Sequence, residues 1–171
     1  MNSIILQPQR EKSLLRRHPW VFSGAIAKIN GDPLSGETVD IFAYDGRFLG
    51  RGSYSPHSQI IVRIWTFDEN EQITPDFFRS RLERAIRFRE SLPITDSNNA
   101  YRLLYAESDG LPGVVVDRYS DYLVCQFLTA GADFWKETII NLLQELVPCK
   151  GIYERSDVDV REKEKLDKKT G

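Results

Sequence analysis

The first 73 residues alternate between apolar and polar positions in short runs, which is typical of β-strands with one buried face. In the clearest run, Val39, Ile41 and Ala43 fall on one side of the predicted strand. Asp45-Gly46 follows and predicts a type I′ hairpin turn. Short strands separated by turn signals indicate a small closed β-barrel. The expected strands cover residues 4–6, 37–43, 47–53 and 60–66.

One helical turn is expected within this β-rich part, over residues 13–17. Helices tend to end before the residue that precedes a proline, and His18-Pro19 follows directly. The turn would carry two adjacent guanidinium groups, those of Arg16 and Arg17.

A long amphipathic helix is predicted after the acidic linker at residues 68–71. Thr74 suits the N-cap, and Pro75 suits the first helical position. The helix should end near Leu92-Pro93. Its apolar stripe consists of Phe78, Leu82, Ala85 and Ile86. The arginines around the stripe are Arg79, Arg81, Arg84, Arg87 and Arg89.

The remaining chain alternates between strand and helix patterns, so we expect a mixed α/β fold with a barrel over residues 1–73 and a small α/β domain over residues 74–171. The second domain should contain a three-stranded meander, an amphipathic helix and one more strand. These elements are expected over residues 102–107, 114–117, 122–128, 134–147 and 151–154. Residues 158–169 are charged and predict a short helix, frayed at its end, without a closing strand.

Composition is that of a globular protein, with 41% hydrophobic residues and a net charge of −2. No run approaches the length of a membrane span, and residues 1–9 lack the features of a signal peptide, so a cytoplasmic location is expected. Charge is unevenly distributed, since residues 1–28 hold five basic residues and one acid. A local basic patch of this kind is compatible with nucleic-acid binding.

Residue types that carry chemistry are present but lack catalytic or metal-binding context. Cys125 and Cys149 are isolated and are expected to be buried free thiols, and no metal site is predicted. Pro148-Cys149 follows a predicted helix, which favours a helix end over a nucleophile. The glycines Gly50 and Gly52 lie in a strand pattern with no helix after it, which favours a bulge or close backbone approach over a cofactor loop.

Three carboxylates, Glu107, Asp109 and Asp117, are close enough in sequence to suggest an acid–base pair. Asp109 and Asp117 are expected at turns, where Asp accepts hydrogen bonds from the local backbone, so structural roles are favoured. No catalytic residue is therefore predicted in this chain.

Long motifs in order along the chain resemble the large-subunit rRNA methyltransferase I family. The first is REKSLLRRHPWVFSGAI, from Arg10 to Ile26. The others are YSP at 54–56, QI at 59–60, WTFD at 65–68, ESDGLPG at 107–113, VDR at 116–118 and IYERSD at 152–157.

This resemblance implies three parts in the intact protein: a PUA domain that recognises RNA, a middle α/β domain and a Rossmann-like methyltransferase domain. The chain resembles the first two, so the S-adenosylmethionine site and the catalytic cysteines are expected to lie outside it. The intact protein would methylate C5 of a cytidine in large-subunit rRNA, and this chain alone is expected to be inactive. A homodimer is left open.

Two other functions compete with this interpretation. A stand-alone RNA-binding adaptor would end where this sequence ends, whereas the methyltransferase would continue with a further domain. A pseudouridine synthase with a PUA domain is disfavoured, because the middle part resembles a different family.

The basic N-terminal segment is the strongest candidate for RNA binding. Arginine binds phosphate oxygens through two parallel hydrogen bonds, and aromatic rings stack on unpaired bases. Trp20 and Phe22 are candidates for such stacking, although a place in the barrel core is favoured for both. The helix arginines extend an RNA path or form a solvated face, of which the second is favoured. The RNA-binding hypothesis names Arg10, Lys12, Arg16, Arg17, His18, Trp20, Arg51, Tyr54 and His57.

Overall fold

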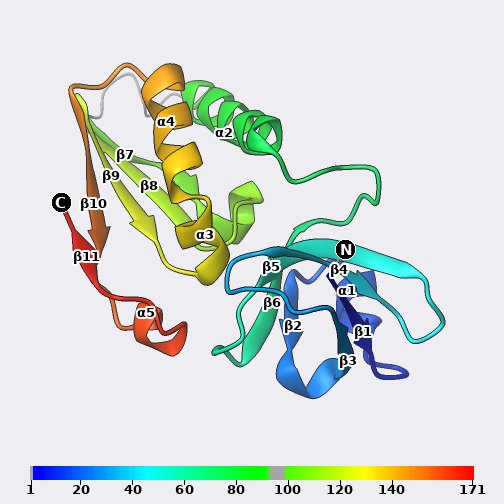
Figure 1. The fold of residues 1–171 in the computed structure, drawn as a ribbon. Helices are drawn as coiled ribbons and strands as arrows, with labels where there is room; N and C mark the ends of the chain where they lie inside the picture. Colours follow the sequence, from blue (N-terminus) through cyan, green and yellow to red (C-terminus); the bar gives the residue numbers. More distant parts are fainter. Residues whose placement is uncertain (1, 93–98) are drawn as a thin grey trace.

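Two β-sheets lie side by side in the computed structural model, which describes residues 2–92 and 99–171 (Figure 1). The first sheet comes from the N-terminal part and the second from the C-terminal part. Helices α2 and α4 lie against the second sheet (Figure 1). The fold is therefore mixed α/β, as predicted.

The first sheet contains six strands in the order β2-β6-β5-β4-β1-β3. Its curled inner face buries one apolar cluster, which includes Val39, Ile41 and Ala43 as the alternation predicts. The edge strands β2 and β3 are not paired with each other in the described chain, so the predicted barrel is an open half-barrel. Both edge strands were missed by the sequence pattern. The strands are β1 (Ser3–Leu6), β2 (Trp20–Phe22), β3 (Ile26–Asn30), β4 (Thr38–Phe42), β5 (Phe48–Tyr54) and β6 (Ile60–Thr66).

The turn between β4 and β5 is wider than the predicted type I′ turn. A type I′ turn needs two residues with positive φ, but only Gly46 has one, at 86°. The Gly46 N–H donates to the Ala43 carbonyl at 3.0 Å, and the Ala43 N–H donates to the Arg47 carbonyl at 2.8 Å. These bonds enclose a three-residue loop.

Glycine in β5 allows a close approach between neighbouring strands, as predicted. A Cβ atom on Gly52 would lie 2.3 Å from the backbone oxygen of Arg63 in β6. The register also shifts between Arg51 and Gly52, which marks a bulge. The glycine-containing stretch is therefore strand interior, not a loop before a helix.

Helix α2 (Pro75–Glu90) begins as predicted, with Thr74 at the N-cap and Pro75 in the first turn. The Thr74 side chain makes no capping hydrogen bond. The helix ends at Glu90, two residues before the predicted end at Leu92, and Pro93 lies outside the described residues. Phe77, Phe78, Leu82 and Ala85 are its buried residues.

The second sheet contains five strands in the order β11-β10-β9-β8-β7. The predicted meander is confirmed, and β10 joins it parallel to β9. The predicted helix over residues 134–147 is confirmed as α4, and a further short helix that was not predicted, α3, directly precedes it and ends before Trp135. The strands are β7 (Ala100–Tyr105), β8 (Val114–Tyr119), β9 (Tyr122–Phe127), β10 (Gly151–Ser156) and β11 (Lys169–Thr170); the other helices are α1 (Lys12–Leu15), α3 (Ala130–Phe134), α4 (Lys136–Leu146) and α5 (Val160–Lys163).

The charged C-terminal segment is integrated into the fold, contrary to the expectation of a frayed helix without a closing strand. Arg161 in α5 is fully buried. Its guanidinium donates to the backbone oxygens of Phe127 and Asp167 and to Asp133 Oδ1, the last two at 2.7 and 3.0 Å. Strand β11 then pairs with β10. The sequence did not predict this ordered structure, because a buried, hydrogen-bonded arginine stabilises the segment and its apolar pattern is weak.

The two sheets are joined by tight packing at α3. A Cβ atom on Gly131 in α3 would lie 2.3 Å from Ser53 Cβ in β5 and 2.9 Å from a ring carbon of Trp65 in β6. Trp65 itself belongs to the apolar cluster of the second sheet, where it contacts Phe77 and Phe78. The half-barrel and the α/β part therefore share a packed boundary.

Candidate nucleic-acid interface

Helix α1 and the residues around it present an exposed basic surface. The single predicted turn is present, one residue earlier than expected, and Leu14 anchors it in the half-barrel core. The cationic or polar side chains on the outside are all exposed. They are Arg10, Lys12, Arg16, Arg17 and His18.

Arg17 is turned toward the centre of the molecule by its backbone. Its φ of 62° lies in the left-handed region, which is uncommon for a residue with a side chain. The guanidinium then lies over the Phe67 ring, 5.0 Å from the centroid. This contact fixes the position of the charge without neutralising it.

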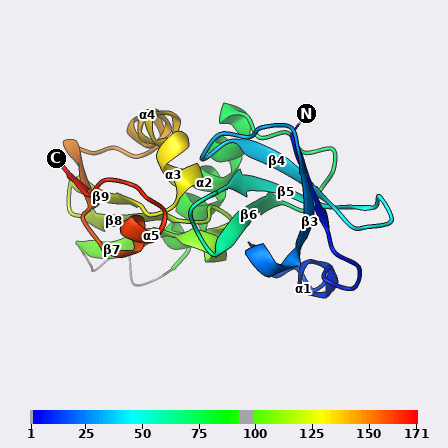
Figure 2. The ribbon, with the colours of Figure 1, turned by 60° about the horizontal axis from the view of Figure 1, so that its bottom comes forward.

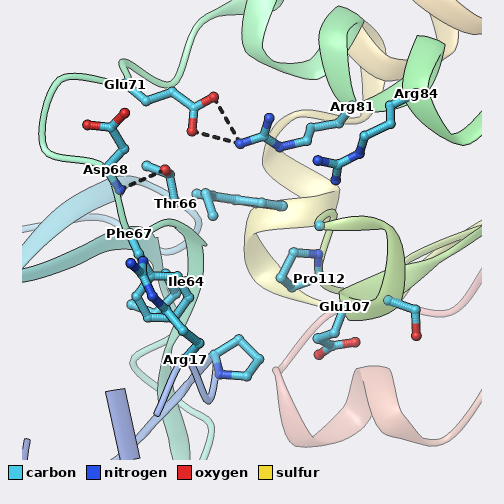
Figure 3. Close-up of a pocket in the computed structure, with 14 residues that line it drawn as sticks. Arg17, Ile64, Thr66, Phe67, Asp68, Glu71, Arg81, Arg84, Glu107 and Pro112 are labelled. Carbon is cyan, nitrogen blue, oxygen red and sulfur yellow. Dashed lines mark hydrogen bonds and ion pairs between the residues drawn. The ribbon is translucent and has the colours of Figure 1, made fainter. Parts of the chain in front are cut away.

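Arg17 lines a hollow of about 610 Å³ between the two sheets (Figure 3). Helix α2 contributes Arg81 and Arg84 from above, and the linker after β6 contributes Asp68 and Glu71. The remaining wall comes from the segment between β7 and β8, with Glu107, Ser108, Gly110 and Pro112. The hollow thus collects three guanidinium groups from distant parts of the sequence.

The two helix arginines have different partners. Arg81 Nη2 donates to both oxygens of Glu71, at 2.9 and 2.7 Å, and its guanidinium stacks on Phe77. Arg84 is exposed and donates to the backbone oxygen of Asp109 at 3.2 Å. Within the described part of the chain, Arg84 therefore faces the hollow without a carboxylate partner.

The predicted solvated face of α2 is confirmed for Arg84 and Arg87, which are exposed, and is wrong for Arg81 and Arg89, which are largely buried. Arg89 forms a two-pronged ion pair with Asp109 at 2.9 and 2.7 Å, and both side chains are largely buried. Arg79 pairs with Glu145 of α4, and Arg87 pairs with Glu83 one turn earlier. Arg79 and Arg89 thus connect α2 to neighbouring elements, whereas the Arg87–Glu83 pair lies within the helix.

Trp20 and Phe22 lie outside the barrel core, contrary to the favoured expectation. Trp20 is half-buried, and its Nε1 donates to Glu107 Oε1 at 2.9 Å across the boundary between the sheets. Phe22 is 48% exposed. Both flank Val21 in strand β2; Val21 is buried in the half-barrel core, so alternation along the strand directs Trp20 and Phe22 to the opposite face.

Arg51 is a structural residue, which corrects its assignment to the RNA-binding surface. Its side chain is buried in β5 and donates to Asp40, with Nε–Oδ1 at 2.6 Å and Nη2–Oδ2 at 3.2 Å. A further bond to the Glu71 backbone oxygen, at 2.6 Å, fixes the linker to the half-barrel. Because the Arg51 guanidinium is buried and bonded to these partners, RNA cannot reach it.

Tyr54 and His57 are not brought to the basic hollow. Tyr54 packs against the half-barrel core. His57 is exposed and lines a different hollow, of about 560 Å³, together with Phe22, Arg63 and Lys163. The structure therefore gathers Arg17 with Arg81 and Arg84, two residues that the RNA-binding hypothesis left out. The i, i+3 spacing of Arg81 and Arg84 places both on one face of α2, and this was the sequence signal that could have identified them as neighbours.

The carboxylates that suggested chemistry have structural partners. Asp109 accepts the Tyr105 backbone N–H at 2.6 Å in addition to Arg89, and Glu107 accepts Trp20. Asp117 lies within β8 and not at the predicted turn, and it binds Arg102 at 2.8 and 3.0 Å.

The thiols differ in burial. Cys125 is fully buried, and burial raises the pKa of its thiol to about 12. Cys149 is only half-buried. In the part of the chain that is described, no group of three His, Cys, Asp or Glu side chains is arranged to hold a metal ion, and no helix is long and apolar enough to cross a membrane.

Comparison with known proteins agrees with this architecture. Residues 4–67 match the PUA-like domain family. Proteins called "Ribosomal RNA large subunit methyltransferase I" are 58% identical in Shewanella amazonensis over 98% of this chain and 52% identical in Yersinia pestis over 95%. The chain spans about two fifths of these relatives, at 42% and 41% of their length.

Solved structures show the same fold at low sequence identity. A putative SAM-dependent methyltransferase from Streptococcus mutans superposes with a TM-score of 0.77, at 18% identity, over 91% of this chain and 41% of its own. The structure of SMU.776, a putative methyltransferase complexed with SAH, gives a TM-score of 0.80 over 91% of this chain and 40% of its own. Over nearly its whole length the chain is thus similar to part of the proteins called "Ribosomal RNA large subunit methyltransferase I", and its residues 4–67 match the PUA-like domain family.

Proposed function

We propose that this chain is the RNA-docking part of an S-adenosylmethionine-dependent methyltransferase that acts on large-subunit ribosomal RNA. High identity to relatives with that name, over 98% of this chain, supports the assignment. The PUA-like match over residues 4–67 supports a role in RNA binding. The relatives are much longer, so the transfer reaction is assigned to the longer protein.

The observation that carries the proposal is the position of Arg17. It lies at the end of the exposed basic segment and also lines the hollow that holds Arg81 and Arg84. A phosphate backbone laid along α1 would therefore reach the hollow at Arg17 and could then meet Arg84, whereas the charge of Arg81 is balanced by Glu71. Glu107 on the opposite wall would repel phosphate and keep the strand on the arginine side (Figure 3).

Roles within this surface follow from exposure and from the partners of each side chain. Arg10, Lys12 and Arg16 are exposed and suit phosphate contacts, which fix position without reading sequence. His18 packs edge-on against Trp20, with ring centroids 5.4 Å apart, at the entrance of the same surface. We therefore propose an RNA-binding set of Arg10, Lys12, Arg16, Arg17, His18, Trp20 and Arg84.

The residues present do not fit S-adenosylmethionine. Its adenosine and methionine groups need a glycine-rich loop between a strand and a helix, whereas the Gly50–Gly52 stretch is closed against β6. We assign the cofactor site, the cysteine chemistry and the methylation of cytosine C5 to the part of the longer protein outside this chain. We also propose a domain boundary between residues 73 and 74.

Salt dependence of RNA binding tests the docking role. Each phosphate contact that is lost should reduce the slope of log affinity against log salt by about 0.7–0.9. Lys12→Ala, Arg16→Ala and Arg17→Ala should each weaken binding of a large-subunit rRNA fragment and lower the slope. Lys28→Ala, on edge strand β3, is the matched control and should leave both quantities unchanged. An unchanged slope in the triple variant would remove this surface from RNA binding.

Methyl transfer tests the assignment of the chemistry. The 171-residue chain mixed with rRNA and labelled S-adenosylmethionine should transfer no methyl group, whereas a protein of the relatives' full length should. Transfer by the short chain would contradict the proposal.

A further inference from the structure

One face of the second sheet carries exposed tyrosines. Helices α2 and α4 cover the other face, where Leu104, Val116, Leu123 and Cys125 belong to the apolar core (Figure 1). Because successive side chains of a strand point to opposite faces, the residues between these core positions lie on the face away from the helices. Four of them are about half exposed: Tyr105, Tyr119, Tyr122 and Tyr153.

Strand register places two of the tyrosines side by side between very small residues. Tyr119 in β8 is directly opposite Tyr122 in β9. The next position outward is Ala100 in β7 on one side and Gly151 in β10 on the other. A Cβ atom on Gly151 would lie 3.5 Å from the Tyr122 ring, so this ring lies beside the glycine. Both rings in this row are about half exposed.

The next row of the same face supplies a polar edge. Arg102 in β7 is paired with Asp117 in β8, and its guanidinium lies 4.9 Å from the centroid of the Tyr105 ring. A hollow of about 280 Å³ is lined by Ala100, Tyr101, Arg102, Asp117 and Tyr119. Arginine and aspartate offer donors and acceptors to the edge of a base, while tyrosine offers a stacking surface.

The composition of the face favours nucleic-acid bases over a protein surface. All exposed large apolar side chains on β7, β8, β9 and β10 are tyrosines, without an exposed aliphatic residue or phenylalanine. Every base has a π-face, so a row of aromatic rings on a sheet accepts unpaired nucleotides of any sequence. Tyr105 directly precedes the turn that carries Glu107 and Ser108, which line the hollow between the sheets. The tyrosine face therefore continues from the proposed docking surface.

We propose that this face is a stacking platform for unpaired bases of the bound RNA, with Tyr119 and Tyr122 at its centre and Arg102 with Asp117 beside them. The inference rests on the RNA-docking function proposed above. It names the form of RNA that is bound: a single-stranded segment adjoining the phosphate-binding surface. Stacking is not electrostatic, which separates it experimentally from the basic surface.

The test measures binding of a short labelled single-stranded RNA of mixed sequence by the 171-residue chain. The variant Tyr119→Leu/Tyr122→Leu should lose affinity by about tenfold or more, from the typical contribution of base–aromatic stacking. Its salt slope should stay unchanged. Tyr119→Phe/Tyr122→Phe keeps both rings and should keep the affinity. Tyr44→Leu, at an exposed tyrosine of the half-barrel, is the matched control.

Protection of tyrosines from chemical nitration is measured on the wild-type chain, so a folding defect of a variant cannot affect the result. Single-stranded RNA should protect Tyr119 and Tyr122 from nitration while Tyr44 stays reactive, and a fully paired duplex should protect neither. Unchanged affinity of the double leucine variant, or no protection, would overturn the platform. The salt-slope result for Lys12, Arg16 and Arg17 would then still stand, so the two proposals fail separately. A leucine variant that binds RNA normally but changes self-association would show a protein contact instead and would equally overturn it.

Discussion

Arg63 in β6 and Glu164 after α5 form a buried ion pair between the two halves of the molecule, with Nη1 and Oε1 2.8 Å apart. Both side chains are almost fully buried. Glu164 also accepts the backbone N–H of Ala130 at 3.2 Å, at the start of α3. One carboxylate thus connects the half-barrel, α3 and the C-terminal segment, and with them the two surfaces proposed to bind RNA.

Replacing Glu164 should destabilise the whole chain. Glu164→Gln leaves the Arg63 charge buried without a partner, which typically costs about 3–5 kcal/mol of unfolding free energy. Urea denaturation should show this loss. Glu162→Gln is the control, because Glu162 is exposed and pairs with the exposed Lys168, and it should cost under about 1 kcal/mol. Equal losses for the two variants would contradict a special role for the buried pair.

Apolar periodicity predicted most of the fold because it reports burial directly. The strands β4, β5, β6, β8 and β9 and helix α2 follow alternation, turn residues and capping residues. Edge strands β2 and β3 were missed because an edge strand of a curled sheet buries few side chains. The segment around Arg161 was predicted to fray because its charged residues are typical of a solvent-exposed surface. In the structure the Arg161 guanidinium is buried and stabilises the segment.

The candidate site was only partly predictable. The exposed charge of α1 follows from local sequence. Arg51 was misassigned because its partners, Asp40 and the Glu71 backbone, depend on sheet register. The meeting of Arg17 with Arg81 and Arg84 depends on how the two sheets pack, which no local pattern encodes.

Close packing between α3 and the first sheet should make Gly131 intolerant of a side chain. The Cβ atom of Gly131→Ala would fall 2.3 Å from Ser53 Cβ, so the backbone or the neighbouring strand must move. Overpacking of this kind typically costs about 1–3 kcal/mol. Gly24→Ala is the control, because no atom lies within 4 Å of its added Cβ. Thermal unfolding of both variants measures the loss of stability. A Gly131→Ala variant as stable as wild type would refute the close contact.

The two thiols should react very differently. Cys125 is fully buried with a pKa of about 12, so it should resist alkylation at pH 8 in the native state, whereas half-buried Cys149 should react first. The pKa also predicts a pH effect on stability. The folded chain holds the proton more tightly than the unfolded chain, whose thiol has the ordinary value of 9.0. The contribution of Cys125 is therefore complete below pH 9 and is lost as pH rises toward 12.

Mass spectrometry after limited alkylation checks the order of reaction. The pH effect is checked by comparing the unfolding midpoints of wild type and Cys125→Ala at pH 8 and pH 10. The loss of stability caused by Cys125 ionisation should occur in wild type and be absent from Cys125→Ala. Rapid labelling of Cys125 in the native chain would contradict its burial.

Arg17 and Arg51 should give opposite results when each is replaced, because one guanidinium is exposed on the surface proposed to bind RNA and the other is buried against Asp40. Arg17→Ala should weaken RNA binding and lower its salt slope by about 0.7–0.9, with little change in stability. Arg51→Ala should instead reduce the unfolding free energy by about 3–5 kcal/mol, because Asp40 is left as an unpaired buried charge. In the fraction that remains folded, its RNA affinity should equal that of wild type. Fluorescence titration and urea denaturation on the same two variants separate the roles. A salt slope that falls in Arg51→Ala but not in Arg17→Ala would reverse the assignment and place the phosphate path on the other side of the half-barrel.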